Sequence, residues 1–171
     1  MGWLTGVLDW AQGLPPGLAM WVITFIPALE LRASIPFGIF VSKCSWPYVV
    51  FQCTVANILV GILYFVFLDK FVHLFLRWKR FARAYEYYAA STQRRIHSSV
   101  ERWGWLGLAV FIGVPLPGTG AYSGALAGYL VGMSYKKFLI ANALGVIMAA
   151  AAVTAACLSA WGAGWLYSNV S

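Results

Sequence analysis

The stretch Trp46–Leu68 is the strongest constraint on this chain, because it runs for 23 residues without a charged side chain. A helix of about 20 apolar residues crosses the hydrocarbon core of a bilayer, where every backbone polar group must be bonded internally. The composition agrees, since 61% of the residues are hydrophobic and only 10% are charged, against about 25% charged residues in soluble domains. The sequence therefore predicts an all-α integral membrane protein.

Positive charge is concentrated beside the apolar runs. The formal net charge of +7 is compatible with nucleic acid or anionic lipid as a partner. Ten of the twelve lysines and arginines flank hydrophobic spans, which is the positive-inside pattern of cytoplasmic segments: Lys70, Arg77, Lys79, Arg80, Arg83, Arg94, Arg95, Arg102, Lys136 and Lys137. We expect a multi-pass protein of the cell (inner or plasma) membrane that contacts membrane lipids and binds no nucleic acid.

The chain before Trp46 is apolar but interrupted. Residues 1–16 predict a short interfacial helix that stops at Pro15-Pro16-Gly17. Residues 17–43 contain Pro27, Pro36 and the charges of Glu30 and Arg32, and neither half is long enough to cross a bilayer. We predict a re-entrant helical hairpin, because irregular backbone at membrane depth must be buried in protein or line a cavity. One continuous spanning helix with an internal Glu30–Arg32 pair is the alternative.

The rest of the chain repeats this order within one transmembrane domain over 1–171. Residues 46–68 predict the first spanning helix. In residues 69–102, aromatic and basic residues alternate at helical spacing, which predicts a cytoplasmic amphipathic helix. Residues 103–133 are broken by Val114-Pro-Leu-Pro-Gly-Thr-Gly120, which predicts a second re-entrant hairpin. Its returning arm has glycine at every fourth position, up to Gly132, a spacing that lets helices approach closely. Residues 137–160 predict the second spanning helix.

Short residue matches connect the two halves. Phe25-Ile26-Pro27 matches Phe111-Ile112-Gly113 at an offset of 86, and Val55-Ala56-Asn57 matches Ile140-Ala141-Asn142 at an offset of 85. The two predicted spans cross the bilayer in opposite directions. We therefore expect two inverted repeats, and paired interrupted segments of this kind mark the midplane site of many secondary transporters.

Two motifs resemble those of a known family. The segments Glu30-Leu-Arg-Ala-Ser-Ile-Pro-Phe-Gly38 and Pro115-Leu-Pro-Gly-Thr-Gly-Ala-Tyr-Ser-Gly-Ala-Leu-Ala127 resemble the small multi-drug export protein family, a distant relative of the DedA/VTT membrane proteins. The resemblance covers about residues 20–160. It implies opposed re-entrant hairpins, a homodimer or higher homo-oligomer, and a DedA-like transporter that is often proposed to be proton-coupled. DedA proteins carry arginines in the second hairpin, whereas residues 114–128 contain none.

Polar groups at membrane depth are the candidate site. A buried charge there is costly and usually marks a substrate or ion pathway. The carboxyl group of Glu30 could bind a proton or form a structural ion pair with Arg32. The guanidinium group of Arg32 could instead bind a phosphate or carboxylate group of a substrate. The breaks in the hairpins leave backbone N–H and C=O groups without helical partners, and a ligand can bond to them. Asn57 and Asn142 could bond to these breaks or form hydrogen bonds between helices. The candidate substrate- or ion-binding residues are Glu30, Arg32, Pro36, Pro115, Pro117, Gly118, Thr119, Gly120, Asn57 and Asn142.

Enzymatic chemistry has little support in the sequence. The three cysteines lack CxxC spacing, neither histidine has a partner at metal-ligand spacing, and no phosphate loop is present. We expect no catalytic residue, metal or cofactor. The favoured function is ion- or proton-coupled transport or flipping of a small amphipathic or lipid-phosphate substrate. A non-transporting membrane scaffold or assembly protein is the alternative, and a membrane lipid-phosphate enzyme is a weaker one.

Overall fold

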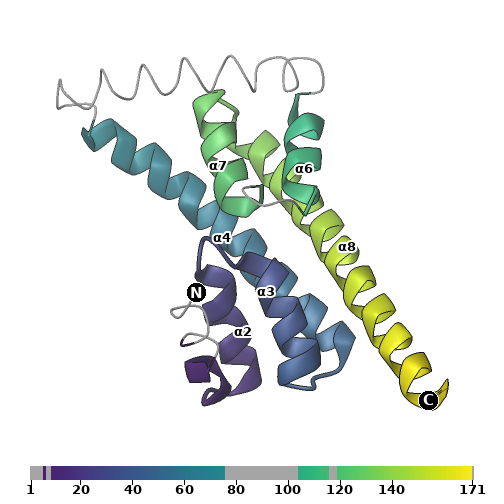
Figure 1. The fold of residues 1–171 in the computed structure, drawn as a ribbon. Coiled ribbons are helices and arrows are strands. Elements are labelled where there is room, and N and C mark those ends of the chain that lie inside the picture. The colour runs from purple at the N-terminus through teal and green to yellow at the C-terminus, as the bar shows by residue number, and fades with distance from the viewer. Residues whose placement is uncertain (1–5, 7–8, 76–103, 116–118, 171) are drawn as a thin grey trace. The chain divides into compact units, whose positions relative to one another are not determined.

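The computed structural model describes residues 6, 9–75, 104–115 and 119–170, and every regular element among them is helical. In chain order these are α2 (Pro16–Phe25), α3 (Glu30–Pro36), the π-helix η1 (Phe37–Val41), α4 (Trp46–Phe75), α6 (Trp105–Gly113), α7 (Ala121–Leu130) and α8 (Tyr135–Val170). Figure 1 shows α4 and α8 as the two long helices. Both contain apolar spans long enough to cross a membrane, Trp46–Phe71 and Tyr135–Trp161. The prediction of an all-α fold is confirmed for the described residues.

The chain divides into two compact units, each of which takes part of both long helices. The first comprises residues 1–57 and 147–171, and the second comprises 58–146. The first unit therefore holds α2, α3, η1, the beginning of α4 and the end of α8. The second holds the remainder of α4, then α6, α7 and the beginning of α8.

In the first unit, α2 and α3 form a pair of short helices joined by a tight turn. Pro16 lies at the first helical position of α2, where its missing N–H has no intrahelical partner to lose. The predicted stop at Pro15-Pro16-Gly17 is therefore the start of α2. Thr24 and Ser34 connect α2 to α3 through a hydrogen bond of 2.7 Å between their hydroxyl oxygens. Because the chain breaks between Phe25 and Glu30, the alternative of one continuous helix is wrong.

In the second unit, α6 and α7 form the corresponding pair, and glycines set how closely they approach. A Cβ added to Gly124 would collide with the side chain of Ile112 on α6. A Cβ on Gly128 would lie 3.1 Å from both Leu108 on α6 and Phe138 on α8. The regularly spaced glycines of α7 therefore serve close packing within this unit, as their spacing indicates.

The long helices extend beyond their predicted ends. The α4 helix continues from Leu68 to Phe75 and so includes Asp69 and Lys70, because charged side chains at the end of a span do not interrupt backbone hydrogen bonding. The α8 helix begins at Tyr135 and runs to Val170. Of the amphipathic helix predicted over 69–102, residues 69–75 belong to α4, and the rest lie outside the described residues.

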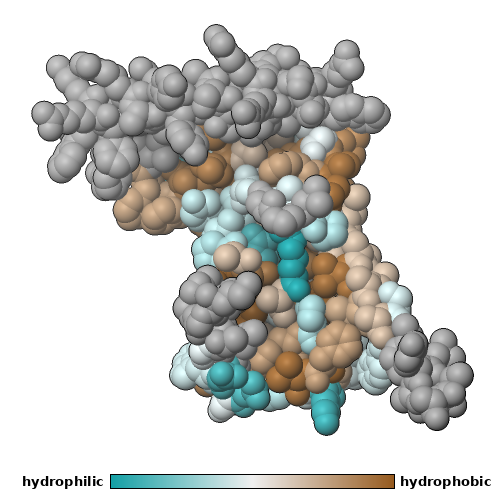
Figure 2. Space-filling view, viewed as in Figure 1, coloured by the Kyte–Doolittle hydropathy of each residue, from teal (hydrophilic) through white to brown (hydrophobic). Residues whose placement is uncertain are grey.

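Large apolar side chains cover much of the described surface, which appears brown in Figure 2. On α4, Phe51 is 66% exposed and Leu63 is 57% exposed, and on α8 Ile147 is 52% exposed. A soluble monomer rarely exposes contiguous apolar patches larger than a few hundred Å². Exposed apolar residues along both long helices are the pattern expected of a lipid-facing surface.

Several helix ends recur in the two units at an interval of 89 residues. This interval separates the starts of α2 and α6, the ends of η1 and α7, and the starts of α4 and α8. The buried residues of α2 are Ala19, Met20, Ile23 and Thr24, and those of α6 are Leu108, Ala109, Ile112 and Gly113. Every buried position of α4, from Val49 to Leu68, has a buried counterpart 89 residues later in α8. The sequence matches at offsets of 85 and 86 are therefore displaced by about one helical turn.

Candidate functional site

The break between α2 and α3 brings Glu30 into the protein interior. The backbone N–H groups of Leu29 and Glu30 both donate to the carbonyl oxygen of Ile26, at 2.9 and 3.1 Å. Glu30 has φ of 47° and is only 5% exposed. A positive φ is uncommon for a residue other than glycine and costs about 1–2 kcal/mol. A buried carboxyl group therefore occupies a strained backbone position at the first residue of α3.

Arg32 lies two residues further along α3 and interacts electrostatically with Glu30. Its side chain is partly buried, so its charge is not wholly solvated by water. The pair predicted from the sequence is therefore present within the first unit. Its role in binding a proton or an anion stays a prediction.

Pro36 ends the α-helical part of the second arm. It is the last residue of α3, and the π-helix η1 follows it directly. Proline has no N–H to donate, so one i→i−4 bond is missing at this turn. Short π-helical segments are rare and occur frequently at functional sites. Irregular backbone is therefore present at both ends of α3, with Glu30 at one end and Pro36 at the other.

The break in the second unit is centred on Gly120, the N-cap residue of α7. Gly120 has φ of 141° and ψ of −170°, a conformation essentially restricted to glycine. Thr119 closes the turn, since its hydroxyl donates to the carbonyl oxygen of Val114 at 2.6 Å. Pro115 is exposed, and Pro117 and Gly118 lie outside the described residues. Glu30 and Arg32 belong to the first unit, and this break belongs to the second.

The two candidate asparagines are buried in different ways. The side-chain amide of Asn142 on α8 donates to the carbonyl oxygen of Ile58 on α4 at 3.0 Å. Asn142 therefore bonds between helices, which is the structural alternative considered for it. Asn57 is 1% exposed, and its Oδ1 has no hydrogen-bond partner among the described residues. At the interval of 89 residues, the counterpart of Asn142 is Cys53 rather than Asn57.

The structure contains a buried polar cluster near the first break that was not among the predicted site residues. Thr24, Ser34 and Cys53 are all fully buried, and they bring α2, α3 and α4 together. The Cys53 thiol is within hydrogen-bonding distance of both hydroxyls. The signal available in the sequence was the presence of Thr24 and Ser34 inside apolar arms on either side of the Pro27–Glu30 break. The hydrogen bond between Thr24 and Ser34 joins the two arms, and Cys53 lies close to it on the long helix.

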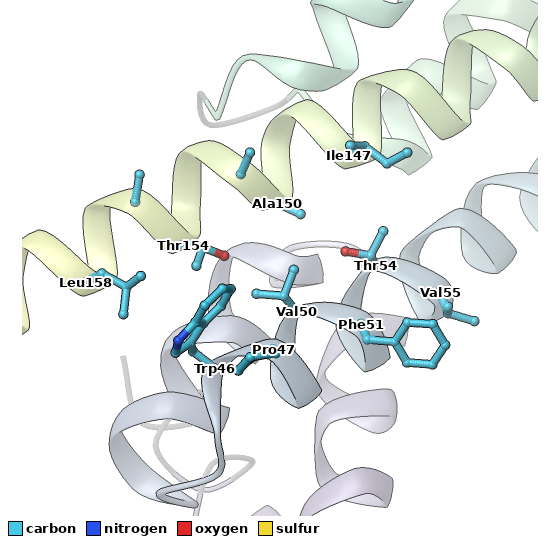
Figure 3. A pocket seen from close by; sticks show the side chains of 12 residues that line it. Trp46, Pro47, Val50, Phe51, Thr54, Val55, Ile147, Ala150, Thr154 and Leu158 are labelled. Carbon is cyan, nitrogen blue, oxygen red and sulfur yellow. The ribbon is translucent and has the colours of Figure 1, made fainter.

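A groove of about 720 Å³ lies between α4 and α8 in the first unit. Figure 3 shows the side chains of Thr54 and Thr154 directed toward the space between these helices, with apolar residues on both sides. Neither hydroxyl oxygen has a hydrogen-bond partner among the described residues. Trp46 and Leu158 line the end of the groove. The sequence analysis did not predict this groove, because its lining comes from segments about 100 residues apart.

Together, the two long apolar helices and the exposed apolar surface define a helical membrane protein with two interrupted helix pairs. A family model described as "Putative small multi-drug export protein" matches residues 30–152, and the chain belongs to this family. The match begins at Glu30 and includes Pro36, the second break and both asparagines. No curated protein and no solved structure matches the chain.

Proposed function

We propose that this protein is a multi-pass transporter of the inner or plasma membrane that exports or flips a small amphipathic or lipid-phosphate substrate in exchange for protons. In this proposal α2–α3 and α6–α7 are re-entrant hairpins, and α4 and α8 span the bilayer. Glu30 binds and releases the proton, and Arg32 binds an anionic group of the substrate. The family description supports export of small molecules.

The observation that carries the proposal is the agreement between the two units. Helix starts, buried positions and capping geometry recur at an interval of about 89 residues. The C-cap residues Ser42 and Val131 have nearly identical dihedral angles, with φ of −79° and −81°. The next residues, Lys43 and Gly132, both have positive φ. Such agreement supports a structural repeat, which is how many transporters build two gates around one site.

The course of the long helices supports an inverted arrangement of these repeats. The first unit contains the beginning of α4 and the end of α8, and the second unit contains the opposite parts. Each short-helix pair belongs to the unit in which the next long helix begins. If both helices span the bilayer, the two pairs enter from opposite sides. In the proposal, the breaks at Glu30 and at Gly120 each supply polar groups to the transport pathway, and Asn57 and Asn142 lie on the long helices that follow them.

The strained position of Glu30 supports a functional role for its carboxyl group. The break in the second unit has Gly120 at a positive φ, where glycine costs little. Glutamate at the first break adds both backbone strain and the cost of burying a carboxyl group. A residue that served only to make the turn would be glycine or asparagine. The carboxyl group therefore has a use beyond the turn, and proton binding is the use that a transport cycle needs.

The glycine pattern does not support the alternative of a scaffold. The space beside Gly124 and Gly128 is filled by Ile112, Leu108 and Phe138 of the same unit. These glycines therefore do not form an open surface for a partner helix. We include a homodimer in the proposal on the family resemblance alone.

Transport in proteoliposomes under an imposed pH gradient tests the proposal. Wild-type protein is compared with Glu30→Gln, Arg32→Ala and the control Asp9→Asn, using a polyprenyl phosphate and a lipophilic cation as substrates. We expect Glu30→Gln to abolish gradient-driven transport and Arg32→Ala to weaken transport of the phosphate, while Asp9→Asn transports normally. Normal gradient-driven transport by correctly folded Glu30→Gln would contradict the assigned role of Glu30.

A further inference from the structure

A second cavity, of about 340 Å³, lies in the second unit where the end of α4 meets the beginning of α8. It is lined by aromatic residues, a carboxylate and small apolar groups: Phe65, Val66, Asp69, Tyr129, Gly132, Met133 and Tyr135. The transport proposal does not use any of these residues.

Three aromatic rings of the cavity are held at different angles. Phe65 stacks on Phe138, with ring centroids 4.1 Å apart and planes 12° apart, so its position is fixed by the core. The ring of Tyr129 is 6.3 Å from Phe65 at an interplanar angle of 77°. The ring of Tyr135 is 6.2 Å away at 46°. The three rings line one cavity and are not parallel, so a bound group would meet them at different angles.

Asp69 supplies a negative charge to the same cavity. It is exposed and lies one turn after Phe65 on α4, close to the end of the apolar span at Phe71. Tyr135 is the first residue of the other apolar span. In the proposed topology the cavity lies at the membrane–water boundary, and the neighbouring Lys70, Lys136 and Lys137 favour the cytoplasmic side.

We propose that this cavity binds an organic ammonium cation, with the positive group against Phe65, Tyr129 and Tyr135 and balanced by Asp69. Aromatic faces attract alkylated ammonium groups, which are less strongly hydrated than small cations. One carboxylate is sufficient to balance such a charge, whereas a hard metal ion requires several oxygen ligands. The same chemistry is present in a free quaternary ammonium ion and in a choline lipid headgroup.

This site is separate from the proposed transport site. None of the residues that line the cavity belongs to the proposed transport site. Binding of a cation can be measured at equilibrium without a gradient, so the experiment does not depend on whether the protein transports.

Calorimetric titration of the full chain with choline tests the proposal, in nanodiscs of phosphatidylglycerol that contain no choline lipid. The matched ligand control is 3,3-dimethyl-1-butanol, which has the same shape as choline without the charge. We expect choline to bind and the alcohol not to bind. Asp69→Asn should weaken choline binding at least tenfold, and Tyr135→Leu should weaken it several-fold. The control Asp9→Asn removes an equal charge elsewhere and should bind like the wild type.

A second titration, in nanodiscs that contain phosphatidylcholine, distinguishes the two sources of the cation. Weaker apparent binding of free choline there indicates that the lipid headgroup competes for the cavity, and unchanged binding indicates a site for soluble ammonium ions. Each variant is first checked for native helical content by circular dichroism. Equal affinity of wild-type protein and folded Asp69→Asn for choline overturns the proposal, as does equal binding of choline and the neutral alcohol.

Discussion

The two cavities occupy equivalent places in the two units but differ in chemistry. At the interval of 89 residues, Phe65, Val66, Asp69 and Tyr135 of the second unit correspond to Thr154, Ala155, Leu158 and Trp46 of the first. All of these residues line one cavity or the other. In the first unit small side chains leave an apolar groove of about 720 Å³. In the second unit aromatic rings reduce the space to about 340 Å³ and add a carboxylate.

The hairpin breaks show the opposite distribution of charge. The first break carries the buried carboxyl group of Glu30, whereas the second break has Gly120 at a positive φ, and the residue 89 positions after Glu30 is Thr119. In the first unit the acidic residue Glu30 thus lies at the break between the short helices. In the second unit the acidic residue Asp69 lies near the end of the apolar span of α4. The two units therefore share their backbone geometry and differ in where they place polar side chains.

The largest expected effect of a substitution is at Phe65 and its counterpart Thr154. Phe65→Ala should lower the free energy of unfolding by about 3 kcal/mol, because it removes a buried ring that stacks on Phe138. Thr154→Val should cost almost nothing, since its hydroxyl has no hydrogen-bond partner among the described residues. Unfolding in mixed micelles containing SDS, followed by tryptophan fluorescence, measures both.

Leu63→Ala is the matched control on α4, because Leu63 is 57% exposed and should face lipid. It should leave stability within about 0.5 kcal/mol of the wild type. Equal losses for Phe65→Ala and Thr154→Val would show that the groove of the first unit is as tightly packed as the second cavity.

The next effect compares the two breaks. Gly120→Ala should lower stability by about 2 kcal/mol, because its dihedral angles are accessible essentially to glycine alone. Glu30→Gly should be more stable than Glu30→Ala by about 1 kcal/mol, since both remove the carboxyl group but only glycine relieves the positive φ. Thermal unfolding in detergent measures the order. Equal stability of the two Glu30 variants would mean that Glu30 carries no backbone strain.

A smaller difference in stability is expected between substitutions of two packing glycines, one in each unit. A Cβ on Gly38 would lie 2.6 Å from Val49 Cγ1 and 2.7 Å from Met20 Sδ. Valine is stiff and cannot move aside, so Gly38→Ala should cost about 1–3 kcal/mol. Gly128→Ala meets flexible or rotatable side-chain ends at 3.1 Å and should cost less than about 1 kcal/mol.

Gly13→Ala is a suitable control for this pair, because its added Cβ would lie at an ordinary 3.4 Å from the carbonyl oxygen of Trp10. Thermal unfolding of the three variants checks the order. A larger loss for Gly128→Ala than for Gly38→Ala would reverse the predicted difference in packing.

The sequence predicted the helical class, both interrupted segments and both long apolar helices, because these follow from apolar length and from proline and glycine. It predicted Glu30 as a buried acid for the same reason, since a charge within an apolar run is visible without a structure. It could not place Asp69 in a cavity, because a charged residue at the end of a span is ordinary. The interval of the repeat could be determined only from the helix starts and the buried positions. Short sequence matches alone fit neighbouring helical turns almost equally well.

The smallest effect tests whether Asn142 serves packing between the long helices. Its amide bonds to the carbonyl oxygen of Ile58, and such bonds between membrane helices contribute about 0.6 kcal/mol on average. Asn142→Ala should therefore cost roughly that amount or slightly more. Asn57→Ala should cost less, because Oδ1 is without a partner among the described residues in both asparagines and only Asn142 has an amide bond to the other long helix.

Gly61 provides a coupled test of the same contact. A Cβ on Gly61 would lie 2.7 Å from Nδ2 of Asn142 and closer still to its Oδ1, so Gly61→Ala alone should destabilise the protein. In the Asn142→Ala background that space is free, and Gly61→Ala should become neutral or stabilising. A double-mutant cycle measures this coupling, because residues in direct contact are not additive. Strict additivity would mean that Asn142 does not hold α8 against Gly61, which would leave its side chain available for the role proposed at the second break.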